Sequence, residues 1–308
     1  MRVSFKQWAQ KGDPWVWLNA GAVAISLVMV LGLLGLIASK GLVHFWPHPV
    51  LEADHIVGDG SRAVIIGEVV ETEDVPAEQL RTAGIEVAEG VEFLRRDLFK
   101  IGNRDVSGFD FRWILDRELE NKRYPETVMT MERYEWGNFY GYLQAVKEDG
   151  KEVAVNELAW TELQQRLERA HNIREKIDHI EQSQIGGINR GIERLRLKER
   201  ALQLKEKATP ERLLDIQTER AEYDAEYEGL QGELTALYGE INRDSLTAKT
   251  MDGTVIEMPL AKVVKAFRPN QMSLYEKIIF YVKQLGSFIT EDPREANTEG
   301  GIFPAIFG

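Results

Sequence analysis

The feature that most constrains this chain is a run of 26 residues, Pro14 to Ser39, that carries no charged side chain. A helix needs roughly 20 apolar residues to cross a hydrocarbon core about 30 Å thick. A single segment can satisfy its own backbone hydrogen bonds in lipid only as a helix. Aromatic residues of the kind that anchor helices at membrane interfaces stand at the two ends: Trp15, Trp17, Phe45 and Trp46. We therefore predict one transmembrane helix over residues 14–46.

Two other interpretations of this run stay open. A cleaved signal peptide has an apolar core of about 7–15 residues and a small-x-small cleavage site. The run is longer than that, and its exit, Ala38-Ser39-Lys40-Gly41, matches such a site weakly. The other alternative is a buried core helix in a soluble domain. The length of the run favours an uncleaved anchor over both.

The distribution of charge predicts the orientation of the anchor. Basic residues that flank a membrane helix stay in the cytoplasm, and three of them precede the run: Arg2, Lys6 and Lys11. Residues 1–13 are therefore predicted to be cytoplasmic, and the chain after Phe45 to lie on the far side of the membrane. Residues 1–40 carry a net charge of +3 and the whole chain −12, so the remainder carries −15. So acidic a domain repels nucleic-acid phosphates, which excludes nucleic acid as a predicted partner.

Residues 47–156 and 244–270 have the character of β-strands. Stretches rich in β-branched or aromatic residues alternate there with turn pairs such as Asp149-Gly150 and Asp252-Gly253, in which glycine accepts a positive φ. We interpret the aromatic residues as a β core rather than as a ligand site. The stretches expected to be strands are 63–70, 109–115, 127–146, 246–250, 255–258 and 260–267.

Residues 157–243, between these two segments, are charged and helical in period. Thr209-Pro210-Glu211 is typical of a helix start, with a capping hydroxyl, an early proline and an acid in the first turn. After it, residues recur at alternating spacings of three and four, and all but one are apolar or aromatic: Leu213, Ile216, Arg220, Tyr223, Tyr227, Leu230, Leu234, Leu237 and Ile241. This heptad pattern predicts a coiled coil.

The helix before Lys207-Ala208-Thr209 has a less regular pattern. Its apolar register slips near Ile173, and Gly186-Gly187 interrupts it, so we expect a bend or break there. A connection as short as residues 207–209 makes the two helices antiparallel neighbours. The predicted fold is therefore membrane-anchored α+β, with a β-rich platform into which a long antiparallel coiled-coil hairpin is inserted.

Residues 271–308 are expected to return to the membrane. Residues 274–289 are amphipathic, and they are too short and too charged to span. They suit a helix that lies in the membrane interface, with packing onto the β platform as the alternative. The chain then ends on an apolar run, which predicts a fragment that stops before a second membrane helix.

The final segment, EDPREANTEGGIFPAIFG from Glu291 to Gly308, resembles the entry to the second membrane helix of PstA-type permeases of phosphate ABC importers. That family has an interfacial helix followed by a G-G-[IL]-x-x-A-[IL]-x-G motif. The matching residues are Gly300, Gly301, Ile302, Ala305, Ile306 and Gly308. The family commonly joins its first helix directly to the interfacial one, whereas about 225 residues intervene here, as in the enlarged N-terminal region of some Gram-negative members.

The resemblance implies the N-terminal portion of a permease subunit in the bacterial inner membrane, with residues 47–308 mainly periplasmic. The implied partners are a second permease subunit, a cytoplasmic ATPase dimer, a periplasmic phosphate-binding protein and membrane lipid. The periplasmic insert is then a docking or gating accessory. Because the permease core is absent, no residue that contacts phosphate or the ATPase is assigned. The alternative function is a single-span coiled-coil adaptor or sensor that works by protein–protein contacts.

The sequence contains no motif that predicts catalysis. The absence of a G-x-x-x-x-G-K-[ST] loop argues against ATP binding by this chain, and the absence of cysteine excludes disulfides and thiol chemistry. Glycines at 58, 60, 186, 187 and 191 are interpreted as loops or helix breaks. The histidines, which lack H-E-x-x-H spacing, are His44, His48, His55, His171 and His179. We therefore predict a non-enzymatic subunit with no catalytic, cofactor-binding or metal-binding residues and no cofactor.

Overall fold

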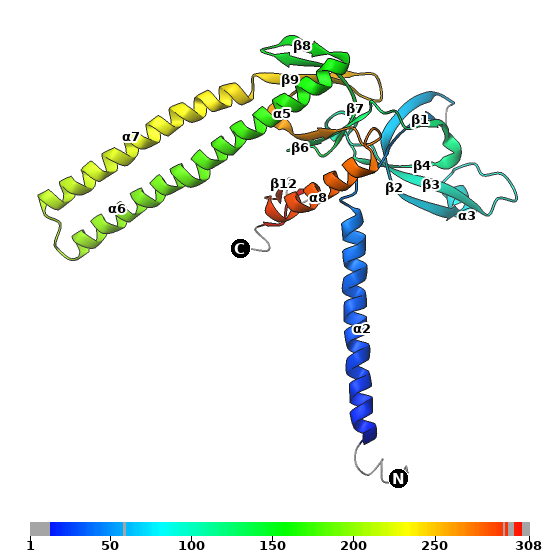
Figure 1. The fold of residues 1–308 in the computed structure, drawn as a ribbon, viewed down its shortest axis with the longest axis horizontal. Helices are drawn as coiled ribbons and strands as arrows, with labels where there is room; N and C mark the ends of the chain where they lie inside the picture. The colour runs from blue at the N-terminus through cyan, green and yellow to red at the C-terminus, as the bar shows by residue number, and fades with distance from the viewer. Residues whose placement is uncertain (1–12, 58–59, 292, 295–298, 304–308) are drawn as a thin grey trace.

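The computed structural model describes residues 13–57, 60–291, 293–294 and 299–303. It consists of a long N-terminal helix, a body of two antiparallel sheets and a helical hairpin that projects from the body (Figure 1). The predicted cytoplasmic residues 1–12, and Ala305, Ile306 and Gly308 of the terminal motif, lie outside the described residues. So do Gly58 and Asp59.

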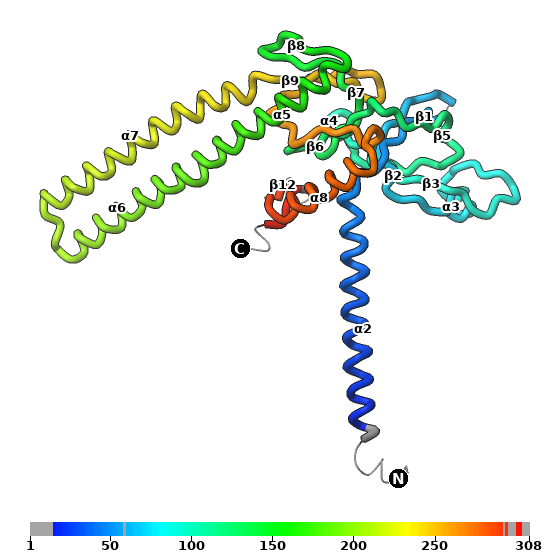
Figure 2. The backbone as a smooth tube through the Cα atoms, in the orientation of Figure 1, coloured from blue at the N-terminus to red at the C-terminus, as the bar shows by residue number. Residues whose placement is uncertain are grey.

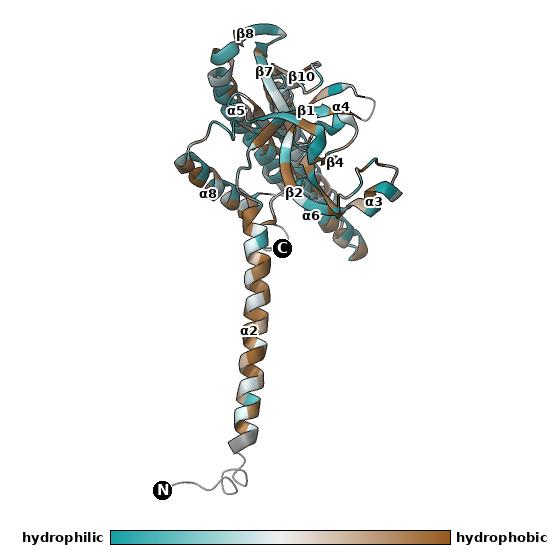
Figure 3. Ribbon diagram, turned by 90° about the vertical axis from the view of Figure 1, so that its right-hand side faces the viewer, coloured by the Kyte–Doolittle hydropathy of each residue, from teal (hydrophilic) through white to brown (hydrophobic). Residues whose placement is uncertain are grey.

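Helix α2 (Asp13–Val43) extends away from the body, and its side chains from Trp15 to Val43 are exposed (Figure 1). Its stretch Trp15–Val43 is the one helix among the described residues that is long and apolar enough to cross a membrane, and none of it is buried. Figure 3 shows its apolar surface running along most of its length. The helix predicted to reach Trp46 ends three residues earlier, because His44, Phe45 and Trp46 close a turn by donating to carbonyls three residues back.

The first sheet has five antiparallel strands in the order β4-β3-β2-β1-β5. Its strands are β1 (Val50–Ile56), β2 (Arg62–Pro76), β3 (Phe93–Lys100), β4 (Phe111–Leu115) and β5 (Leu119–Arg123). The connections include three short helical segments, α3 (Ala77–Thr82), α4 (Arg104–Ser107) and η1 (Asp116–Glu118). Phe99 and Ile114 lie in its buried cluster. Strands β1, β3 and β5 were not among the predicted stretches.

The second sheet joins segments from both sides of the hairpin. Its order is β10-β9-β7-β6-β11, and β8 also pairs with β7. Its strands are β6 (Met129–Arg133), β7 (Phe139–Glu148), β8 (Lys151–Val155), β9 (Asp244–Lys249), β10 (Val255–Pro259) and β11 (Val263–Phe267), the last preceded by the 3₁₀ turn η3 (Leu260–Lys262). Both predicted turns form hairpins: Asp149 and Gly150 have positive φ between β7 and β8, and Gly253 has positive φ between β9 and β10.

The hairpin is built from two long helical arms that lie side by side (Figure 1). The first arm is α5 (Asn156–Asp178), a π-helical segment (His179–Ile185) and α6 (Gly186–Leu204), and the second is α7 (Pro210–Ile241). Between residues 211 and 241, the predicted heptad positions are buried or half-buried apart from Arg220, and all other positions are exposed. The burial therefore follows the predicted pattern, while supercoiling of the pair stays a prediction.

Of the bend or break expected at Gly186-Gly187, the break does not occur. The backbone passes from α5 to α6 without interruption (Figure 2), and the π-helical turn just before the glycines absorbs the slip in apolar register. Gly191 has a packing role instead: a Cβ there would lie 2.5 Å from the ring of Tyr223 on α7. The glycine thus lets an aromatic residue of one arm pack directly on the backbone of the other.

Helix α8 (Leu274–Thr290) begins with a capping box, in which Ser273 and Glu276 bond each other's backbone N–H groups. The predicted amphipathic helix over residues 274–289 is therefore confirmed to within one residue. Beyond it, the short strands β12 (Pro293–Arg294) and β13 (Glu299–Gly300) pair with each other.

The buried contact between the two arms gives a stability prediction. Leu237 on α7 is 9% exposed and packs with Ile177 and Ile180, whereas Leu214 on the same helix is 62% exposed. We expect Leu237→Ala to lower the free energy of unfolding by about 2–4 kcal/mol, because it leaves a cavity. The matched change Leu214→Ala should alter it by less than about 0.5 kcal/mol. Thermal unfolding followed by circular dichroism measures both, and equal effects would contradict the packing described.

Candidate functional site

The end of α2, both sheets and α8 meet at one place, which we call the junction. Just after α2, the ring of Phe45 lies 5.0 Å from that of Phe288 on α8, and the ring of Trp46 lies 6.0 Å from that of Tyr281. The aromatic residues expected at the end of the apolar helix therefore pack against α8. These contacts fix the point at which α2 leaves the body.

Asn270, in the turn after β11, holds the junction together. Its Oδ1 accepts from the Val50 N–H at 2.9 Å, and its Nδ2 donates to the carbonyls of Val50 at 2.8 Å and Pro125 at 2.9 Å. One amide side chain thereby completes the backbone hydrogen bonding at the start of β1. The chain that leaves α2 is thus held to the loop that leads into α8.

The junction contains a cavity of about 230 Å³, the junction cavity, and Glu132 of β6 is one of the residues that line it. Lys265 lies 3.1 Å from a carboxylate oxygen of Glu132 and donates to Gln284 of α8, which in turn donates to Glu132 at 3.1 Å. Arg294 lies 3.7 Å from Glu132. The network connects β6, β11, α8 and β12 along the lining of the cavity.

Two tyrosines of β7 connect the sheets next to the junction. Tyr140 is fully buried and bonds Glu68 of β2, and burial raises the pKa of both side chains, although Lys100 opposes the shift of Glu68. Tyr142 donates to Glu52 of β1, and burial together with that bond raises the pKa of Tyr142. These pairs hold the first sheet against the second.

Helix α8 presents two different faces. Phe280, Gln284 and Phe288 face the junction cavity. The opposite side carries an exposed apolar stripe: Leu274, Tyr275, Ile278, Ile279, Val282 and Ile289. The two alternatives for this segment, lying in an interface or packing on the platform, therefore apply to different faces of the same helix. Figure 3 shows α8 lying across the body end of α2.

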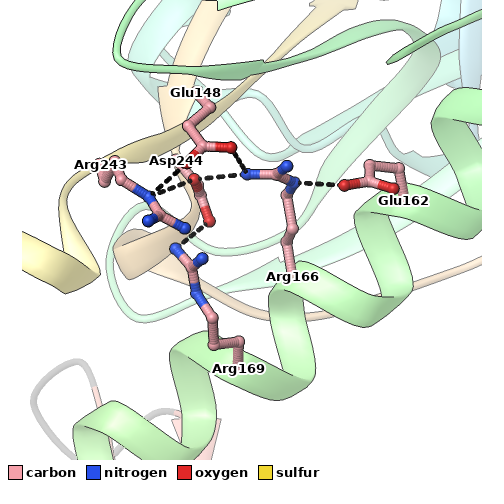
Figure 4. Close-up of polar contacts among 6 residues, drawn as sticks. All are labelled: Glu148, Glu162, Arg166, Arg169, Arg243 and Asp244. Atoms are coloured by element: carbon pink, nitrogen blue, oxygen red, sulfur yellow. Dashed lines mark hydrogen bonds and ion pairs between the residues drawn. The ribbon is translucent and has the colours of Figure 1, made fainter. Parts of the chain in front are cut away.

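An ion-pair network holds the base of the hairpin (Figure 4). The carboxylate of Asp244, at the start of β9, is 4% exposed, lies 2.7 Å from Arg166 and also bonds Arg169. Glu148 of β7 accepts from Arg166 at 2.9 Å, and that bond lowers the pKa of Glu148. Arg243 pairs with both acids, and Glu162 with Arg166. The sequence did not predict this network, because its paired residues lie far apart in the chain and within charge-rich stretches.

The five histidines do not come together as a metal site among the described residues. His44 is exposed, and His48 is half-buried with a pKa lowered by burial and by His44. His55 is buried and lies 3.7 Å from Glu118, while His171 and His179 belong to the first arm of the hairpin. Within the part of the chain that the structure describes, no group of three or more histidine or acidic side chains is placed to hold a metal ion.

Searches against protein-family models, curated proteins and solved structures find no match to this chain.

The network at the base of the hairpin gives a second prediction. Asp244→Asn removes the buried charge that compensates three arginines, and breaking a buried ion pair costs about 3–5 kcal/mol of stability. We expect a lower thermal midpoint and earlier proteolysis at the base of the hairpin. Glu193→Gln, which removes one partner of the exposed Arg196 pair on α6, serves as the control and should change neither. An unchanged midpoint for Asp244→Asn would show that the network is dispensable.

Proposed function

We propose that this protein is a non-catalytic, membrane-anchored docking protein, in which α2 spans the bilayer, α8 lies in its interface and the hairpin binds a protein partner. The observation that carries the proposal is the pair of unburied apolar surfaces that meet at the junction. One is the whole length of α2 and the other is the stripe on α8. Exposed apolar surface of this extent is typical of sites that bind membranes or proteins.

The proposed orientation places the body and the hairpin in the periplasm of a bacterium. The basic residues before the apolar run support a cytoplasmic N-terminus, and an uncleaved anchor agrees with a helix that continues without a break into the turn at His44–Trp46. In this arrangement the exposed stripe of α8 is buried among lipid headgroups and the upper acyl chains. The hairpin, a coiled coil in this proposal, then projects away from the point of anchoring.

A narrower proposal is that the docking protein is the N-terminal portion of a PstA-type permease in a phosphate importer. Its support is the terminal motif, of which Gly300, Gly301 and Ile302 are described. A Cβ at Gly301 would lie 1.9 Å from the carbonyl oxygen of Glu291, and the Ile302 N–H donates to the Phe288 carbonyl. Because it has no side chain, Gly301 lets the motif fold back on the end of α8. This close approach explains why a glycine stands at that position of the motif.

In the importer, the partners are a second permease subunit, a cytoplasmic ATPase dimer and the periplasmic phosphate-binding protein. The hairpin acts as a docking or gating accessory on the periplasmic face. Its acidic surroundings argue against capture of dissolved phosphate, because anion sites use backbone N–H groups or arginines rather than a negative field. The adaptor or sensor alternative shares the anchor and the hairpin but has no role in transport.

Topology reporters test the anchor. A periplasm-dependent enzyme fused after residue 150 or residue 245 should be active, because both positions follow the predicted span, whereas a fusion before residue 12 should be inactive. The matched control is a cytoplasm-dependent reporter at the same positions, which should give the reverse pattern. Activity of the periplasmic reporter only before residue 12 would overturn the orientation and the importer proposal with it.

Deletion of residues 60–265 from the full-length membrane protein tests the narrower proposal. Phosphate uptake that depends on the binding protein should fall several-fold, while the amount of subunit in the membrane stays the same. The purified chain should also show no saturable binding of inorganic phosphate by calorimetry at millimolar concentrations. Unchanged uptake after the deletion would reject the docking role in transport and favour the adaptor.

A further inference from the structure

We propose that the junction cavity binds the phosphate of an anionic phospholipid headgroup. The inference rests on the proposed membrane anchoring and extends it from an apolar surface to a specific lipid site. The cavity is smaller than the roughly 300–1,000 Å³ of sites for drug-sized ligands. Its size therefore suits a phosphate and its glycerol rather than a whole lipid.

The polar part of the site is centred on Arg294. Its side chain is 16% exposed, and its Nε and Nη1 are buried and have no hydrogen-bond partner among the residues that the structure describes. Nη2 is the atom that faces Glu132, at 3.7 Å. Buried donors without acceptors are costly, and a guanidinium presents its donors in the fork that matches phosphate oxygens. The geometry thus leaves two donors of one arginine for an anion.

The other charges of the cavity are compatible with a single anion. Lys100 and Lys265 also line it, and so do the carboxylates of Glu132 and Glu291. Glu132 is engaged by Lys265 and Gln284, so it does not use the free donors of Arg294. Asn138 and Ser287 supply further polar lining. An anion that contacts Arg294 therefore completes the network without displacing an existing pair.

The apolar part of the lining points to a lipid as the source of the phosphate. Phe45 and Trp46, at the end of α2, and Phe280 and Phe288 of α8 form one side of the cavity. Acyl chains of a lipid held there would run along the exposed apolar surface of α2. Dissolved phosphate has to approach through the negative electrostatic field of an acidic domain. In the proposed arrangement, the bilayer itself holds the phosphate of a lipid at the level of the junction.

The test uses the full chain in a neutral detergent, titrated with phosphatidylglycerol and with phosphatidylcholine, with bound lipid counted by native mass spectrometry. We expect one phosphatidylglycerol to bind about ten-fold more tightly than phosphatidylcholine. Arg294→Gln should weaken phosphatidylglycerol about ten-fold, the size of one charge-assisted hydrogen bond. Arg294→Lys should keep most of the affinity. Arg190→Gln, which removes an exposed arginine from α6, should change nothing.

Equal affinities for the two lipids, or equal losses in the Arg294 and Arg190 variants, would overturn the proposal. Saturable calorimetric binding of inorganic phosphate to lipid-free protein, abolished by Arg294→Gln, would assign the site to dissolved phosphate and reject the lipid. Circular dichroism of each variant separates lost binding from lost folding, and Arg294→Lys decides the matter if Arg294→Gln unfolds. If the topology reporters behave as expected but the protein shows no preference between the two lipids, the headgroup site is refuted. The proposed membrane anchor is not contradicted by that result.

Discussion

The arrangement of this protein depends on the buried carboxylate of Asp244. The hairpin leaves the second sheet after β8 and returns at β9, so its two ends start from strands that both pair with β7. Such an insertion is held in one direction only if its base is fixed to the sheet. Asp244 provides this by binding Arg166 and Arg169 of α5 from the first residue of β9. The charges are largely removed from water, which makes each pair sensitive to loss of its partner.

Polar contacts between the two sheets, and between β1 and the chain that leads into α8, hold the rest of the body in place relative to the base of the hairpin. Tyr140 and Tyr142 of β7 reach carboxylates of the first sheet, and Asn270 ties the start of β1 to the chain that leads into α8. Helix α8 then packs its aromatic face on the end of α2. The hairpin, the sheets and both apolar surfaces are therefore held together by these contacts, as the proposed docking function requires.

Periodicity in the sequence predicted the elements that local patterns determine. The apolar run became α2, the heptad residues from Leu213 to Ile241 other than Arg220 became the buried face of α7, and the two Asp-Gly pairs became hairpin turns. What the pattern did not reveal depends on contacts between distant residues. The pairing of Asp244 with Arg166 joins residues 78 positions apart, and both belong to charge-rich stretches that look solvated. The role of Gly191 was also hidden, because only the approach of Tyr223 explains a glycine there. The junction cavity is lined by residues between positions 44 and 300 of the chain. No local sequence pattern predicts a site of this kind.

The central claim is that the body rests on a bilayer through α8 as well as through α2. Spin labels at Val282, in the exposed stripe, and at the neighbouring exposed residue Lys283 test it most directly, since the two positions point in different directions around the helix. In lipid nanodiscs, the label at Val282 should collide with dissolved oxygen and be shielded from a water-soluble paramagnetic reagent. The label at Lys283 should show the opposite preference. Equal exposure of both labels to the aqueous reagent would contradict the account.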